Sequence, residues 1–240
     1  MNTEKNSYIF IYSTIMVVVI AAALTYVSQS LKEPQENNIR IEKMQNILAS
    51  VNIVSTPKNA EEIYKKFITS SLVVNSKGEK IENAIAFDIN LADELKKEKI
   101  EERLFPVYIC TPNEGDSLQL YIVPLRGKGL WGPIWGYMSF QPDFNTIAGC
   151  VFDHKGETPG LGAEINTAVF QKQFFGKQIF DTVNKFTSVG IMKGGAKDDD
   201  IHAVDAISGG TITSKGLEAM VKDCLSSYQE YFSKNKAQKL

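Results

Sequence analysis

The sequence predicts an α+β protein in which an N-terminal transmembrane helix precedes a single domain with a mainly antiparallel sheet and a long C-terminal helix. Three observations support this prediction. An uncharged apolar segment near the N-terminus is long enough to span a bilayer, strand-like segments dominate the middle of the chain, and one apolar stripe at helical spacing runs near its end. Because the strands come before the helices, an antiparallel sheet is favoured over a doubly wound parallel one.

The composition excludes several classes of protein. With 43% hydrophobic and 22% charged residues, the chain of 240 residues is neither disordered throughout nor fibrous. Its 26 basic and 28 acidic residues give a formal net charge of −2, so we expect no nucleic-acid partner. Three scattered cysteines (Cys110, Cys150 and Cys224) cannot form a complete disulfide framework, and without Cys/His ligand spacing we expect no metal site.

The N-terminal segment is predicted to be an uncleaved membrane anchor. No charged residue lies between Asn6 and Leu31, and about 20 apolar residues are enough to cross the hydrocarbon core of a bilayer. We therefore place a transmembrane helix at residues 8–31, after a short tail of residues 1–7. A cleaved signal peptide is the alternative, since residues 21–23 are small, but its apolar region would be shorter.

The charges around the anchor give only weak information on its orientation. Lys5 precedes the segment, whereas Lys32, Arg40 and Lys43 follow it, which mildly favours a cytoplasmic domain. Long domains translocate largely regardless of charge, so this bias does not decide the side.

The remaining elements follow in order. Residues 32–50 mix apolar and charged side chains and are predicted to form a juxtamembrane helix or linker, after which residues 51–240 form the domain. A short helix is predicted at residues 59–67, with Asn59 as its N-cap and acidic residues in its first turn. Six strand-like segments come next, at residues 72–74, 84–89, 106–110, 118–123, 134–140 and 147–152.

The last third of the chain is predicted to contain two helices and a short strand. One helix runs from residue 163 to about 174, and the strand covers residues 189–192. The terminal helix, at residues 214–232, has the clearest pattern, because its apolar residues recur at helical spacing. They are Leu217, Met220, Val221, Cys224, Leu225, Tyr228, Tyr231 and Phe232.

The segment DAISGGTITS, residues 205–214, leads directly into this terminal helix. Its two glycines permit a tight turn, and its hydroxyl residues can cap the helix. The start of a helix offers unpaired N–H groups and the positive end of the helix dipole, which suit a phosphate. A well-capped helix entered through a glycine turn is the alternative. The segment is not a Walker loop, because GxxxxGK[ST] is absent.

Three further glycine-rich segments are candidate ligand contacts. GETPGLG at residues 156–162 forms a loop whose backbone can approach a flat ligand, or a simple turn before a helix. KGGA, which starts at Lys193, can place an ammonium group beside an anion. GKGLWG at residues 127–132 sets Trp131 among glycines, where the indole either stacks on an aromatic cofactor or simply packs.

Together the motifs GKGLW, GETPGLG, KGGA and D-x-x-S-G-x-T-x-T-S resemble the NqrC family, the C subunits of the sodium-translocating NADH:quinone oxidoreductases. The resemblance covers the anchor and most of residues 120–225. It implies that residues 51–240 bind one FMN covalently, through a phosphoester to the threonine that closes the family's S-G-A-T motif. That position is Thr211, with Thr213 as the competing hydroxyl. The family usually carries alanine where this chain has Gly210.

The resemblance also implies which residues surround the flavin. Lys193 is expected beside the phosphate or the N1 side of the reduced flavin, Leu161 against a face of the ring, and Trp131 over the ring or along its approach. The expected cofactor-binding residues are Asp205, Ser208, Gly209, Gly210, Ile212, Thr213, Lys193, Gly194, Glu157, Thr158, Gly160, Leu161, Gly162 and Trp131.

By the same resemblance, the chain is an electron-transfer subunit that is not catalytic alone. Electrons are expected from NADH through NqrF and an iron centre of NqrD and NqrE, and leave towards the NqrB flavin and ubiquinone, coupled to Na⁺ export. NqrA is a further subunit of the complex, and an ApbE-like flavin transferase is the maturation partner. The family places the flavin domain on the periplasmic side of the bacterial inner membrane, against the charge bias.

Two alternatives stay open at this point. RnfG-like subunits of ferredoxin:NAD oxidoreductases share ETPGLG and the SGAT-type motif, but have another electron donor and acceptor; GKGLW and Gly156 favour NqrC over them. The other alternative is a membrane-anchored interaction protein without redox function, in which the glycine motifs are purely structural.

Overall fold

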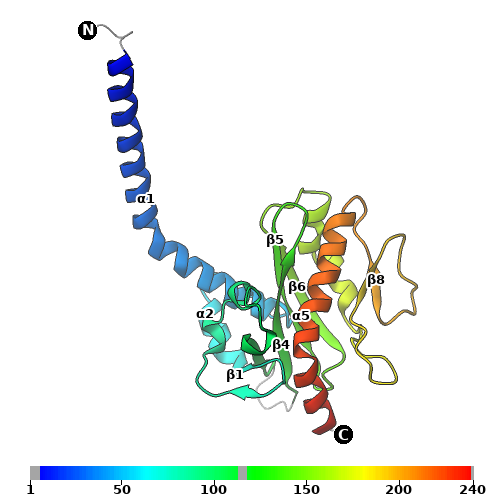
Figure 1. Ribbon diagram of the computed structural model, residues 1–240. Coiled ribbons are helices and arrows are strands. Elements are labelled where there is room, and N and C mark those ends of the chain that lie inside the picture. Colours follow the sequence, from blue (N-terminus) through cyan, green and yellow to red (C-terminus); the bar gives the residue numbers. More distant parts are fainter. Residues whose placement is uncertain (1–5, 113–117, 239–240) are drawn as a thin grey trace. The chain divides into compact units, whose positions relative to one another are not determined.

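The computed structural model describes residues 6–112 and 118–238, so most of the expected N-terminal tail lies outside the described residues (Figure 1). The chain divides into two compact units, Met1–Lys43 and Met44–Leu240. Helix α1 (Asn6–Ala49) starts in the first unit and runs without a break through both the predicted anchor and the predicted juxtamembrane segment. It is long and apolar enough to cross a membrane, and its apolar side chains from Ile9 to Leu31 are exposed.

The second unit is built on a six-stranded sheet with the order β2-β1-β3-β4-β5-β6, in which every neighbouring pair is antiparallel. This sheet confirms the predicted fold class. A separate pair, β7 and β8, is parallel. The strands are β1 (Ile68–Val74), β2 (Lys80–Ile81), β3 (Phe105–Cys110), β4 (Leu120–Lys128), β5 (Pro133–Phe140), β6 (Ile147–His154), β7 (Gly190–Met192) and β8 (Ala203–Asp205).

Helices connect and cover these strands. The α-helices after α1 are α2 (Ala60–Phe67), α3 (Leu91–Glu94), α4 (Ala168–Gln171) and α5 (Thr211–Gln238). Short 3₁₀-helices are η1 (Ala86–Asp88), η2 (Ile100–Glu102), η3 (Gly162–Asn166) and η4 (Lys172–Phe174).

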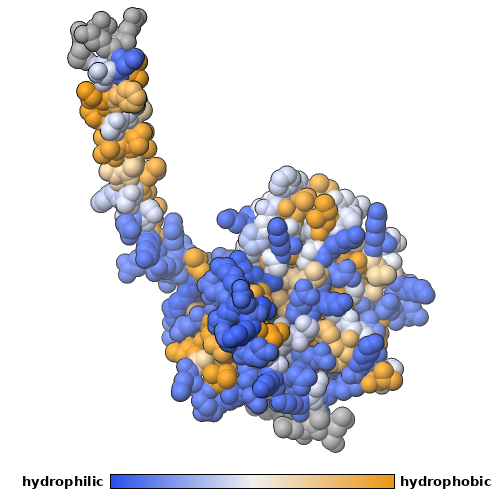
Figure 2. Space-filling model, in the orientation of Figure 1, coloured by the Kyte–Doolittle hydropathy of each residue, from blue (hydrophilic) through white to orange (hydrophobic). Residues whose placement is uncertain are grey.

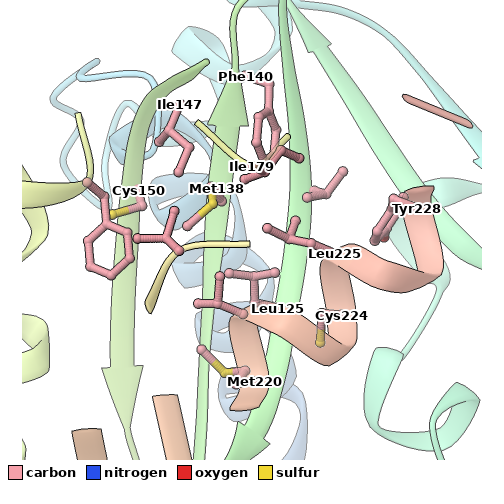
Figure 3. Packing of buried hydrophobic residues seen from close by; sticks show 14 of the residues in the cluster. Leu125, Met138, Phe140, Ile147, Cys150, Ile179, Met220, Cys224, Leu225 and Tyr228 are labelled. Atoms are coloured by element: carbon pink, nitrogen blue, oxygen red, sulfur yellow. The ribbon is translucent and has the colours of Figure 1, made fainter. Parts of the chain in front are cut away.

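The sheet is the middle layer of the second unit, with a hydrophobic core on each face. On one face α5 lies along β4, and Met220 and Leu225 of the helix pack with Leu125 of β4 and Met138 of β5 (Figures 1 and 3). On the other face, the C-terminal end of α1 and the apolar side chains of α2 pack against the sheet. The position of α5 brings its first turn close to the turn between β4 and β5, because Gly216 of the helix lies against the carbonyl of Lys128.

Two predicted elements have a different structure. Residues 84–89 contain the 3₁₀-helix η1 instead of a strand, because they pack as a turn: the Phe87 ring lies 5.7 Å from that of Tyr64, and the carbonyl of Ala86 accepts from the Tyr108 hydroxyl. The helix predicted from residue 163 to 174 is broken into η3, α4 and η4. Thr167 is extended and caps α4, which interrupts the helix.

The two helix starts also differ from expectation. Asn59 stands at the N-cap position of α2, but its side chain accepts from the backbone N–H and the hydroxyl of Thr56 and makes no hydrogen bond to the helix. Helix α5 begins at Thr211, three residues before the predicted start at residue 214, because the N–H of Ser214 already donates to the carbonyl of Gly210. Strands β2 and β8 were not predicted, because runs of two or three residues have no detectable alternation.

All three cysteines are buried and free of disulfide bonds. Burial raises the pKa of the Cys110 and Cys224 thiols from 9.0 to about 11, and raises that of Cys150 still further. The stability from keeping these thiols neutral is complete below pH 9 and is lost as the pH rises through 11.

We therefore expect the free energy of unfolding to fall as the pH rises above 9.0, which is the pKa of a cysteine thiol that is not buried. Denaturant titrations across this range measure the fall.

A thiol reagent at about pH 8 should modify no cysteine in the folded chain and all of them in urea. Rapid modification of the folded chain would contradict the burial.

Candidate cofactor site

Three of the four motifs meet in a pocket of about 220 Å³ at the first turn of α5. One wall is the turn between β4 and β5, a second is the loop after β6, and the third is the start of α5. The lining residues are Leu130, Trp131, Glu157, Thr158, Leu161, Gly162, Gly209, Gly210, Thr211, Ile212 and Thr213.

The start of α5 is fixed by a hydrogen-bonded turn. The N–H of Gly210 donates to the carbonyl of Ile207 at 3.1 Å, and the Ser214 hydroxyl accepts from the N–H of Ile207 at 3.1 Å. Thr211 is the first residue of the helix. N–H groups in a first helical turn have no carbonyl partner within the helix, and the helix dipole is positive there. This end of the pocket therefore favours a negatively charged group such as a phosphate.

The two threonine hydroxyls of this turn have different surroundings. Thr213 is buried, and its hydroxyl donates to Oε2 of Glu157 at 2.5 Å. Thr211 is half-buried, and its hydroxyl makes no hydrogen bond with any residue that the structure describes. Of the two hydroxyls in this turn, that of Thr211 is therefore the one available to a ligand.

Glu157 lies at the base of the pocket with both carboxylate oxygens engaged. Its side chain is buried; Oε1 accepts from the backbone N–H of Trp131 at 2.9 Å, and Oε2 accepts from Thr213. The backbone N–H of Glu157 donates to Nδ1 of His154 at 3.1 Å, which fixes the start of the loop. Sequence reasoning placed Glu157 near the cofactor but gave no sign of these contacts.

Large apolar side chains surround the pocket. Leu130, Trp131, Leu161 and Ile212 are 46%, 70%, 41% and 59% exposed, and they come from all three walls. Figure 2 shows orange side chains at the end of the second unit where α5 begins, at the top of this view. Exposed apolar clusters usually mark the place of a ligand or partner. A flat aromatic ring on this rim, with a phosphate at the helix start, fits the arrangement.

The other expected contacts lie outside the pocket lining. Asp205, at the end of β8, accepts from the N–H of Ala196 at 2.7 Å and so holds the loop that contains Lys193 and Gly194. Lys193 is exposed. Ser208 and Gly160 are exposed positions in the two loops that supply the lining.

The two glycines before α5 are under different constraints. Gly209 has φ +73°, and a Cβ there would lie 2.5 Å from Cδ2 of Leu161. A Cβ at Gly210 would lie 2.9 Å from Cγ2 and 3.2 Å from Cβ of Ile207, so the half-buried Ile207 side chain would have to move slightly. Gly209 therefore needs to be glycine for its left-handed backbone conformation, whereas the backbone of Gly210 does not require glycine.

We expect Gly209→Ala to lower the free energy of unfolding by about 1–2 kcal/mol, the usual cost of a left-handed conformation for an L-residue. Gly210→Ala should lower it by less than about 1 kcal/mol, because alanine also reduces the entropy of the unfolded chain. Urea unfolding of both variants measures the difference. A larger loss for Gly210→Ala would contradict this assignment.

Comparison with known proteins defines the class of the protein. Residues 129–226, which include the whole pocket lining, match the FMN-binding domain family. The chain is 31% identical to a protein of Haemophilus ducreyi named as the C subunit of a Na(+)-translocating NADH-quinone reductase, over 89% of this chain and 86% of the relative. It is 34% identical to the protein of that name from Pasteurella multocida, over 80% and 79%.

Solved structures agree with these relatives. The C subunit of the Na(+)-translocating NADH-quinone reductase of Parabacteroides distasonis is 41% identical, with a TM-score of 0.76 over 85% of this chain and 97% of that one. Shewanella oneidensis NqrC is 31% identical, with a TM-score of 0.70 over 82% and 98%. The chain belongs to the NqrC family, the C subunits of the Na⁺-translocating NADH-quinone reductases. It is an FMN flavoprotein and a subunit of an oxidoreductase complex. The names of these relatives favour the NqrC interpretation over the RnfG-like alternative, and the match to the FMN-binding domain family favours it over an interaction protein without redox function.

Proposed function

We propose that this chain carries one FMN, bound covalently through its phosphate to Oγ1 of Thr211, and relays electrons within the Na⁺-translocating NADH-quinone reductase. One observation carries the proposal. The Thr211 hydroxyl stands without a partner among the described residues at the start of α5, in a pocket with an apolar rim. The competing Thr213 hydroxyl is buried and donates to Glu157.

The attachment reaction needs FAD and a flavin transferase of the ApbE type. The Thr211 oxygen forms a bond to the phosphorus of the FMN half, the pyrophosphate bond of FAD breaks, AMP leaves, and the hydroxyl proton is released. No electrons are exchanged. The N–H groups of the first turn of α5 stabilise the negative charge of the resulting phosphodiester.

When bound, the flavin supplies one-electron transfer, and the chain's own residues hold it in place. Trp131, Leu161 and Ile212 give the ring an apolar surface and keep water from it. Thr158 and the backbone of Gly162, Gly209 and Gly210 complete the lining. Lys193 adds a positive charge from the loop after β7, and Asp205, Gly194, Ser208 and Gly160 shape the loops around the pocket.

Electrons reach this chain from NADH through NqrF and the iron centre of NqrD and NqrE, and pass to the flavin of NqrB and to ubiquinone, coupled to Na⁺ export. NqrA is part of the same complex. The names of the relatives support membership in such a complex, and the exposed apolar helix α1 supports single-pass anchoring in the bacterial inner membrane. We place the flavin domain on the periplasmic side.

Two experiments test this proposal. In the assembled complex in vesicles, Thr211→Ala should abolish NADH:ubiquinone electron transfer and Na⁺ uptake together, whereas Thr211→Ser should keep both. Full activity without the hydroxyl would refute the relay.

The periplasmic position of the flavin domain is tested with C-terminal fusions. A fusion to alkaline phosphatase should be active, and a fusion to green fluorescent protein should be dark. The opposite result would place the domain in the cytoplasm.

A further inference from the structure

We propose that Glu157 is a positioning residue that ties the Trp131 turn to the first turn of α5. Through these two contacts it holds the walls of the flavin pocket together and keeps the Thr213 hydroxyl out of the attachment reaction. This inference rests on the proposed function, because it assigns Glu157 a task in choosing Thr211 as the attachment site.

The contacts of the carboxylate carry the argument. Glu157 is 4% exposed, and no residue that the structure describes forms an ion pair with it. Instead, one oxygen accepts from Trp131 of the β4–β5 turn and the other from Thr213 of α5. A buried carboxylate is costly unless it is hydrogen-bonded, so each donor fixes it and is fixed by it. The result is a link between segments that are far apart in the sequence.

Glycines from two motifs leave room for this link. A Cβ at Gly129 would lie 2.5 Å from Oε1 of Glu157, and a Cβ at Gly162 would overlap Oε2 and the Thr213 hydroxyl. Gly216 of α5 plays a similar part, because a Cβ there would overlap the carbonyl of Lys128. These three glycines therefore allow the close approach of three protein segments.

The link has two consequences for the flavin. It fixes the backbone of Trp131 by a hydrogen bond, although the residue is 70% exposed. The indole ring therefore lies at the pocket on a backbone that is held in place. It also holds the hydroxyl of Thr213, a residue that is 1% exposed, in a buried hydrogen bond, which leaves Thr211 as the available nucleophile of this turn.

The test uses the full chain in detergent, co-expressed with its flavin transferase, as wild type, Glu157→Ala, Glu157→Gln and Thr213→Val. Glu164→Ala is the matched control, because Glu164 lies in η3, directly after the loop of Glu157, and among the described residues its side chain accepts only from the N–H of Gly160. We measure native flavin fluorescence and the rate of tryptic cleavage after Lys128, at the end of β4. Far-UV circular dichroism checks that each variant is folded.

In Glu157→Ala, cleavage after Lys128 should be about tenfold faster, which corresponds to the loss of a hydrogen bond to a charged group, and flavin fluorescence should rise. Glu157→Gln should stay within about twofold of wild type, because an amide oxygen still accepts from Trp131. Thr213→Val should show an intermediate rate, and the double variant Glu157→Ala/Thr213→Val should be no worse than Glu157→Ala, since both remove one network.

Wild-type cleavage and fluorescence in Glu157→Ala would overturn the proposal, as would a folded Glu157→Gln that behaves like alanine. If Glu157→Ala does not fold, wild-type cleavage and fluorescence in Thr213→Val would overturn the proposal instead. The cleavage measurement needs no flavin. A wild-type chain without FMN would therefore end the Thr211 proposal while the cleavage after Lys128 still decides the role of Glu157.

Discussion

Thr211→Ala should abolish covalent flavin while the chain still folds. The Thr211 side chain is half-buried at the start of α5 and makes no hydrogen bond with the described residues, so its removal costs little stability. The same change removes the oxygen that bonds to phosphorus. Flavin fluorescence of the denatured protein, after co-expression with the transferase, measures the loss directly.

Two further variants serve as controls for this experiment. Thr211→Ser keeps a hydroxyl at the first position of α5 and should retain flavin. Thr213→Ala removes a hydroxyl that donates to Glu157, so it should disturb the pocket but leave the attachment in place. Flavin that persists in Thr211→Ala and vanishes in Thr213→Ala would transfer the attachment to Thr213.

Phe232→Ala should lower the free energy of unfolding by about 3–5 kcal/mol, the usual range for a large aromatic side chain removed from a core. Phe232 is fully buried, and its ring centroid lies 4.9 Å from that of Phe140, 5.9 Å from Tyr228 and 6.0 Å from Phe144. Few of these contacts can re-form around alanine. Urea unfolding measures the loss.

Two comparisons make this stability prediction specific. Phe232→Leu should cost less, because leucine fills much of the same volume, and exposed Lys222→Ala should change stability by less than about 0.5 kcal/mol. Phe232 is about 30 Å along the helix axis from Thr211, so the folded fraction of Phe232→Ala should still carry flavin. A loss within about 0.5 kcal/mol, as at exposed sites, would contradict the packing of α5 against the sheet.

The elements with a strong, long pattern could be predicted from the sequence. The apolar stripe of α5 predicted its buried face, and the run of strand-like segments predicted an antiparallel sheet. Residues 84–89 look like a strand by composition, but they fold as η1 because the Phe87 ring packs against Tyr64. Local propensity does not contain such a contact between distant segments.

The candidate site could be predicted as motifs but not as contacts. The glycine segments indicated a pocket at the start of α5, while the choice between two hydroxyls depends on the direction of each side chain. Thr211 and Thr213 point about 160° apart around a helix, to nearly opposite sides. Extending the apolar stripe back from Leu217 by one turn reaches Thr213, which is a signal for its burial. The link from Glu157 to Trp131 joins separate segments and needed the structure.

The attachment of FMN to Thr211 is tested most directly by fragmentation mass spectrometry of the tryptic peptide 198–215, which contains both threonines. The wild-type chain, matured with its flavin transferase, should carry the mass of one FMN less one water on Thr211. The same mass on Thr213, or an unlabelled peptide from a fully matured chain, would contradict the assignment.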